Sequence, residues 1–138
     1  MLQTSRELLW SRWPFKENGC AIMCCMFIAE QKKAVDVTRE LIERKVSIMR
    51  LDDVVTKELF INDWKKVFEV LGMNVEYDGH CPAHQVFLDE DEFEILEVSA
   101  EGGRHFVVGD GEGRTIYDPL GKRNDYAVIT KRGFRWAK

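Results

Sequence analysis

The chain has 138 residues, of which 45% are hydrophobic and 32% are charged, and its formal net charge is −4. This length corresponds to one domain, and the apolar content is sufficient to build a buried core. The acidic balance gives no electrostatic basis for binding nucleic acid, and we interpret the basic pairs at 122–123 and 131–132 as solvated surface. We therefore expect a single domain over residues 1–138.

No apolar run approaches the roughly 20 residues of a membrane-spanning helix, so we expect no membrane insertion. The first residues also lack the basic and then apolar pattern of a signal peptide. The four cysteines include the adjacent pair Cys24-Cys25, which is not typical of a secreted disulfide framework. These features predict a cytoplasmic protein, and they do not indicate its oligomeric state.

The first part of the chain has the periodicity of helices. We predict a short helix at 4–11 and then an extended segment leading to Asn18, which is a good N-cap residue. The run from Ala21 to Ala29 is apolar on every face, which is typical of a helix buried in the middle of a domain. The polar residues 30–33 then return the chain to solvent.

Three more helices are predicted before residue 73. One is capped by Asp36 and covers 37–46, and a short one covers 51–59. The third is capped by Asn62 and ends at Gly72. Its apolar residues repeat at helical spacing: Trp64, Val67, Phe68 and Leu71.

The second part of the chain changes to the two-residue period of strands. The predicted strands are 73–77, 93–98, 104–109, 114–118 and 126–130. Phe134 and Trp136 are expected to pack against the end of the sheet. Helices followed by an antiparallel sheet predict an α+β fold, in which the central buried helix packs on the C-terminal sheet.

The predicted strands 104–109 and 114–118 form a hairpin around the turn Asp110-Gly111-Glu112-Gly113. A symmetric turn places Val107 opposite Ile116 and His105 opposite Asp118. Directly opposed residues have Cβ atoms roughly 4.5–5.5 Å apart, so Asp118 is within reach of the His105 Nδ1–H group. A slip of one residue would send the two side chains to opposite faces.

Cys20 is predicted to lie in the first turn of the buried helix, just after the cap Asn18. The helix dipole favours a thiolate there, and the thiolate is the reactive form of cysteine. With His105 and Asp118 from the hairpin, the chain offers a thiol, an imidazole and a carboxylate. Nucleophilic catalysis by a thiol requires these three groups.

Two segments resemble the papain-like cysteine peptidases, and within them the bacteriocin-processing and related small families. These are Gly19-Cys20-Ala21 at the start of an apolar helix, and His105-Phe106-Val107-Val108-Gly109 running to Tyr117-Asp118-Pro119. The resemblance implies a papain-like domain that hydrolyses a peptide or amide substrate without a cofactor. It also implies that Cys20 is the nucleophile, His105 the general base and Asp118 the group that orients the histidine.

One departure from the family concerns the oxyanion. Such peptidases usually have a glutamine a few residues before the cysteine, but residues 11–17 contain none. Asn18 is the nearest candidate, although it is also the predicted helix cap. Because the loss of one oxyanion donor costs roughly 100- to 1000-fold in rate, an inactive papain-like binding module is the alternative function.

Zinc binding is a further alternative. Cys20 and Cys24 are one helical turn apart, and the segment His80-Cys81-Pro82-Ala83-His84 offers more thiol and imidazole ligands. However, the chain has no C-x-x-C pair, and Cys24 and Cys25 have the surroundings of core residues. We therefore interpret 80–84 as a polar loop between strands and predict no metal site.

Overall fold

The structure is a computed structural model that describes residues 19–100, 103–121 and 126–137. The helices are α3 (Cys20–Gln31), α4 (Arg39–Leu51) and α5 (Trp64–Val70). The strands are β1 (Val75–Glu76), β2 (His80–Pro82), β3 (Glu92–Ala100), β4 (Gly103–Gly109), β5 (Thr115–Tyr117) and β6 (Ala127–Trp136). The predicted α+β class is confirmed. The predicted helix at 4–11 lies outside the described residues.

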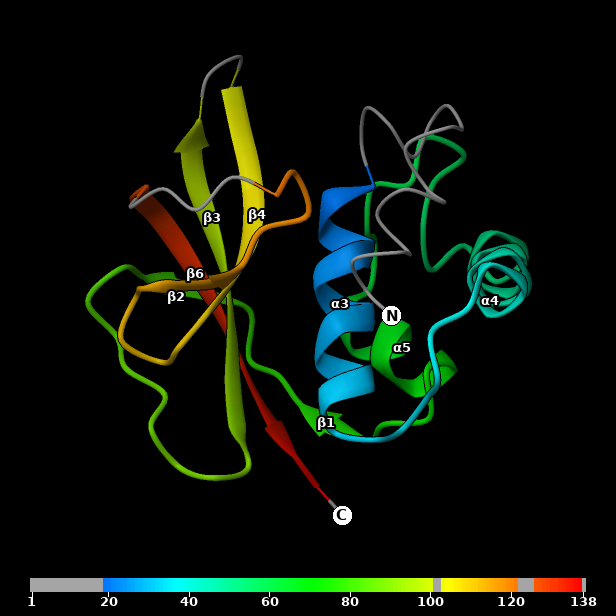
Figure 1. Cartoon of the computed structure of the whole chain (residues 1–138), viewed down its shortest axis with the longest axis horizontal. Helices are drawn as coiled ribbons and strands as arrows, with labels where there is room; N and C mark the ends of the chain where they lie inside the picture. The colour runs from blue at the N-terminus through cyan, green and yellow to red at the C-terminus, as the bar shows by residue number, and fades with distance from the viewer. Residues whose placement is uncertain (1–18, 101–102, 122–125, 138) are drawn as a thin grey trace.

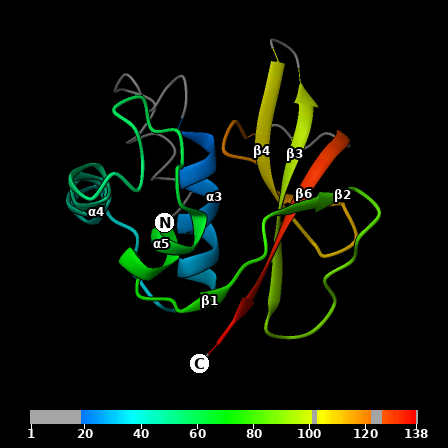
Figure 2. The same ribbon diagram turned by 180° about the vertical axis from the view of Figure 1, so that it is seen from behind.

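All strands belong to one antiparallel sheet in the order β1-β6-β3-β4-β5, and β2 pairs with another part of β6. The long strands β3 and β6 pair at its centre, and β5 forms one edge. Figures 1 and 2 show the helices together on one side of the sheet, with α3 next to the strands and α4 farthest from them. Within the described residues, no helix is both long and apolar enough to cross a membrane.

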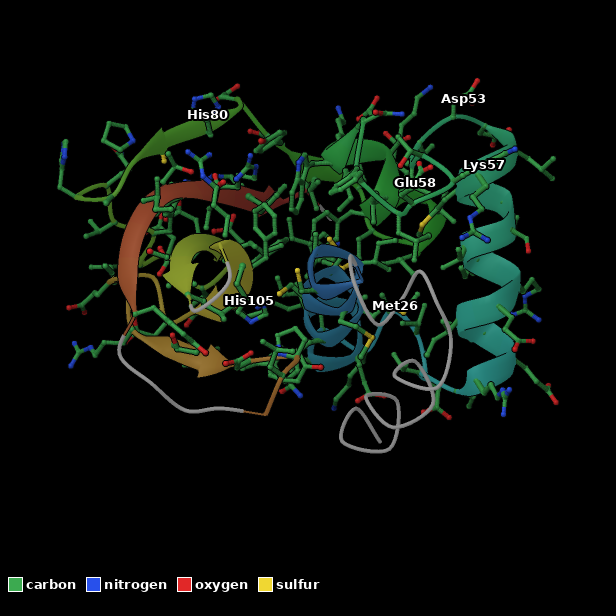
Figure 3. The ribbon with its side chains drawn as sticks, turned by 90° about the horizontal axis from the view of Figure 1, so that it is seen from above. Met26, Asp53, Lys57, Glu58, His80 and His105 are labelled. Carbon is green, nitrogen blue, oxygen red and sulfur yellow. The ribbon has the colours of Figure 1, made fainter. Side chains whose placement is uncertain are left out.

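The core is built around α3, which lies between the sheet and α4 (Figure 3). From Ala21 to Ala29 every residue is buried except Phe27, as expected for a run that is apolar on all faces. The aromatic residues of α5 pack α5 against the sheet: the rings of Phe68 of α5 and Phe134 of β6 have centroids 4.9 Å apart. The prediction of a central buried helix packed on a C-terminal sheet is therefore confirmed.

The caps of the other two helices differ from the predictions. Thr38, rather than Asp36, caps α4, and Asp63, rather than Asn62, caps α5. Both residues have extended backbones, and each side chain accepts the backbone N–H group three residues later. Such a bond satisfies one of the free donors at a helix start. The capping position therefore depends on the backbone conformation, and several adjacent polar residues were chemically suitable.

The helix predicted at 51–59 is wrong, because this segment is a tight loop. Asp53 and Leu59 have φ angles of 56° and 72°, a left-handed conformation that helices do not contain. An isolated bridge between Val55 and Ile61 closes the loop. Leu59 is fully buried, so this apolar side chain fills the core from a loop.

The strands β2 and β6 were also incompletely predicted. The segment interpreted as a polar loop forms β2, and β6 continues to Trp136 instead of ending at 130. The basic pair in the middle of β6 hid this continuity, because we interpreted it as solvated surface. In the structure Lys131 is 1% exposed and pairs with Glu94, while Arg132 pairs with Glu97.

The register of the β4–β5 hairpin differs from the prediction as well. Val108 pairs with Tyr117 and Gly109 with Thr115, and a bulge separates the two pairs. A symmetric turn would instead have placed Val107 opposite Ile116. The extra residue of a bulge shifts the pairing on one side of it. Consequently Asp118 follows the end of β5 and is not paired with a residue of β4.

Candidate active site

Cys20 is the first residue of α3, and it follows Gly19, which has no side chain to cap the helix. The backbone N–H groups of a first turn have no acceptor within their own helix, so they remain available to an anionic group. The thiol of Cys20 is partly exposed, whereas those of Cys24 and Cys25 are buried, as predicted for core residues. Gly19, rather than the predicted Asn18, is the cap residue of α3. Asn18, which is also the predicted oxyanion donor, lies outside the described residues.

The buried thiols of α3 differ chemically from Cys20. Burial is the main cause that raises the pKa of Cys24 and of Cys25. The nearby thiols and the Asp118 carboxylate raise the pKa of Cys24 further. Both buried thiols therefore stay protonated, and within α3 only Cys20 combines a thiol with access to solvent.

One face of α3 aligns Cys20 with the end of the hairpin. Cys20, Cys24 and Phe27 are spaced four and three residues apart, so they lie on the same side of the helix. The ring of Phe27 stacks on Tyr117 of β5, with centroids 4.3 Å apart and planes 4° from parallel. This contact holds the helix face against β5, and Asp118 is the residue that follows Tyr117.

His105 lies on β4 and is 5% exposed. Its Nε2 atom is 2.7 Å from Asp118 Oδ1. The predicted contact between the two side chains is therefore present, although it uses Nε2 and not the expected Nδ1. Figure 3 shows His105 between the sheet and α3. Because Asp118 occupies Nε2, Nδ1 is the ring nitrogen left for another partner.

The electrostatics of His105 indicate that Cys20 lies close to the same ring. Burial alone would lower the pKa of His105, because it penalises the charged ring. Hydrogen bonds and electrostatic interactions with Asp118 and Cys20 outweigh burial and raise the pKa of His105 to about 9. The thiol thus lies within interaction range of the imidazole. At neutral pH the ring is an imidazolium held between two acidic groups.

The Asp118 carboxylate is fully engaged. Oδ1 also accepts the backbone N–H of Leu120 at 2.9 Å, and Oδ2 accepts the hydroxyl of Tyr126 at 2.5 Å. Burial would raise the pKa of Asp118, but the hydrogen bonds from His105, Tyr126 and Leu120 outweigh it and lower the pKa. At neutral pH Asp118 is therefore an anion beside His105.

Sequence reasoning missed Tyr126, which it treated only as the first residue of a strand. Tyr126 is eight residues after Asp118, and no helical or strand period in the sequence links the two side chains. The contact depends on how the end of β5 and the start of β6 lie relative to each other in the folded chain. No pattern in the sequence could have identified this contact.

The alternative zinc site is not assembled. His80 and Cys81 belong to β2, whereas Cys20 and Cys24 belong to α3, and Figure 3 shows His80 away from α3. Among the described residues, no three His, Cys, Asp or Glu side chains are placed to hold a metal ion. The arrangement that the structure does assemble is a thiol, an imidazole and a carboxylate.

Comparison with known proteins found no match: no family model, no curated protein and no solved structure matches the chain. The chemistry of its own side chains is thus the basis for assigning a function.

Proposed function

We propose that this protein is a thiol-dependent hydrolase of the papain-like type that cleaves peptide or amide bonds. One observation supports the proposal most directly. The buried His105 ring is held by Asp118 at 2.7 Å and interacts with Cys20, the accessible thiol at the start of a buried helix. Such a cluster can generate a thiolate and return a proton to a leaving group.

In the first half of the reaction, the Cys20 thiolate attacks the carbonyl carbon of the substrate and a C–S bond forms. The carbonyl oxygen becomes an oxyanion. The His105 imidazolium then donates its proton to the amine as the C–N bond breaks, and a thioester of Cys20 remains. Asp118 keeps the ring in one orientation throughout and stabilises its charged form.

In the second half, neutral His105 removes a proton from water while the water oxygen attacks the thioester. The C–S bond breaks, the acid product leaves, and the Cys20 thiolate and the imidazolium are restored. The backbone N–H group of Cys20, at the start of α3, is the proposed oxyanion donor. The side chain of Asn18 is the candidate for a second donor.

The architecture supports a papain-like fold. The proposed nucleophile begins the central helix, and the proposed base lies on a strand of the sheet that packs against this helix. All four cysteines are unpaired, which suits a reducing compartment, and we propose a cytoplasmic location on this ground.

An inactive binding module is the second candidate, because residues 11–17 contain no glutamine to complete the oxyanion site. Such a protein would keep the fold and bind peptides or amides without cleaving them. Turnover is the property that separates the two functions.

The test compares the wild type with Cys20→Ala on a broad library of peptides and amides. We expect Cys20→Ala to lower kcat by at least about 1000-fold, because it removes the nucleophile. Cys81→Ala, which removes another partly exposed thiol, is the matched control and should keep full activity. If nothing is cleaved and Cys20→Ala binds library members as well as the wild type does, the binding module replaces the hydrolase.

A second test needs no substrate. Iodoacetamide should label Cys20 well before Cys24, Cys25 and Cys81, because only Cys20 combines exposure with a neighbouring imidazolium. Mass spectrometry of a labelling time course measures the order. Equal labelling of the four cysteines, or labelling of Cys81 first, would contradict a reactive Cys20.

A further inference from the structure

We propose that Tyr126 is a positioning residue of this site, which holds the Asp118 carboxylate and thereby the His105 ring in the reactive orientation. The inference rests on the proposed function and adds to it a fourth side chain that the papain-like resemblance does not imply.

The hydrogen bonds of Asp118 show how this works. The Tyr126 hydroxyl donates to Oδ2 at 2.5 Å, while His105 and the Leu120 N–H group bind Oδ1 at 2.7 and 2.9 Å. The two oxygens are thus held by donors from different parts of the chain, so the carboxylate cannot turn about its own axis. Among the described residues, Tyr126 provides the side-chain donor to Oδ2.

The packing of Tyr126 makes it a fixed reference for the carboxylate. Its ring packs against the buried cluster of Leu96, Val98 and Val107. It also meets the His105 ring edge-on, with centroids 6.0 Å apart and planes at 69°. Because the Tyr126 phenol contacts both His105 and Asp118, it can set the relative orientation of these two side chains.

The groups near Tyr126 keep its phenol protonated, so that it can donate a hydrogen bond. His105 interacts with Asp118, which follows β5, and with Cys20 of α3, and Cys24 is buried near Asp118. Burial, the hydrogen bond with Asp118 and the negative charge of Asp118 raise the pKa of Tyr126 to about 12. The hydroxyl therefore remains protonated throughout the range in which His105 titrates.

Tyr126→Phe removes the donor and keeps the ring. Without the donor, Oδ2 is free to turn toward solvent, and Asp118 stabilises the imidazolium less well. We expect the pKa of His105 to fall by about one unit, a tenfold change in its protonation equilibrium. The alkylation of Cys20 by iodoacetamide at neutral pH should slow severalfold.

The experiment records the NMR signals of the His105 ring and the iodoacetamide rate of Cys20 between pH 5 and 10. Tyr77→Phe is the matched control, because Tyr77 is another partly buried phenol, and its ring stacks on Phe134 of β6. It should leave both pH profiles as in the wild type. A Tyr126→Phe protein that melts earlier but keeps both wild-type profiles would show a merely structural role and overturn the inference.

A measurement on the wild type covers the case in which Tyr126→Phe does not fold. The ¹³Cζ signal of Tyr126 should change along the titration curve of His105, because the carboxylate links the two rings. A ¹³Cζ signal of Tyr126 that does not change as His105 titrates would overturn the inference. The hydrolase proposal fails separately, through a Cys20 that iodoacetamide labels no faster than Cys81.

Discussion

Two pairs of buried, oppositely charged side chains lie close to the same hairpin, and they differ in what each leaves unbound. In the first, Lys131 Nζ lies 2.9 Å from Glu94 Oε1, with 1% and 0% of the two side chains exposed. In the second, His105 Nε2 lies 2.7 Å from Asp118 Oδ1, with 7% and 1% exposed. By burial and distance alone, the two pairs are nearly equivalent.

The first pair is saturated by the surrounding chain. Lys131 also donates to the backbone oxygen of Gln85 at 2.7 Å, and Glu94 Oε2 accepts the N–H groups of Gly111 and Gly113 at 2.9 Å each. These bonds fix the turn between β4 and β5, which is where the bulged register begins. Gly109 leaves room for the carboxylate, since a Cβ atom there would lie 2.2 Å from Glu94 Oε2.

The second pair keeps one ring nitrogen for another partner. His105 uses Nε2 for Asp118, and the same ring interacts with Cys20. Burial of charge therefore does not distinguish the pair of the proposed site from a structural pair. The distinguishing feature is a buried imidazole beside a partly exposed thiol.

The largest expected effect concerns the structural pair. Lys131→Met leaves Glu94 as an unpaired buried charge and should lower the free energy of unfolding by about 3–5 kcal/mol, measured by urea denaturation. Lys65→Met, at an exposed position of α5, is the control and should change stability little. In the folded variant, Cys20 should react with iodoacetamide as fast as in the wild type. Slower labelling there would mean that the two pairs are not independent.

The next largest expected effect is the pH dependence of stability that comes from the His105–Asp118 pair. The pKa of His105 is about 9 in the folded protein against an ordinary value of 6.5, so protonated His105 stabilises the fold. This contribution is complete below about pH 6.5 and disappears as the pH rises through about 9, a total of up to about 3 kcal/mol.

Urea denaturation of the wild type and of His105→Gln at pH 6, 7.5, 9 and 10 measures this contribution. The stability advantage of the wild type should shrink steadily as the pH rises. A constant difference, or one that grows with pH, would show that His105 is not held as an imidazolium.

The smallest effect comes from the same chemical change in both pairs. Asp118→Asn removes the negative charge that lies beside His105. It should slow iodoacetamide labelling of Cys20 about tenfold at neutral pH. Glu94→Gln makes the matched change from carboxylate to amide in the structural pair. It should destabilise the protein without altering the labelling rate. Equal rates in both variants would remove the basis for the distinction.

Local patterns were sufficient for the elements on which the site is built. The run from Ala21 to Ala29 is apolar on all faces, so its burial follows from composition alone. The helical period places Cys20, Cys24 and Phe27 on one face without reference to the rest of the chain. The glycine-containing turn predicted a hairpin with His105 and Asp118 on its two strands, although the register that was predicted for it was wrong.

Contacts between distant segments decided the rest. Lys131 of β6 can be buried because its ammonium group reaches Glu94 on the neighbouring strand β3, although its direct cross-strand partner is Leu96. The sequence pattern along one strand does not show which residues the neighbouring strand provides. The same reason explains why the bulge went unpredicted, since Glu94 binds the turn from outside the hairpin.

The sequence by itself determined which residues could take part in the chemistry: a cysteine at a helix start, and a histidine and an aspartate at the two ends of a hairpin. Only the tertiary structure decided that His105 meets Asp118 through Nε2 and that Tyr126 holds the other carboxylate oxygen. Helix and strand periods fix on which face a side chain lies. Which atom bonds to which depends on how three separate elements close around one point, and that is set by packing across the whole domain.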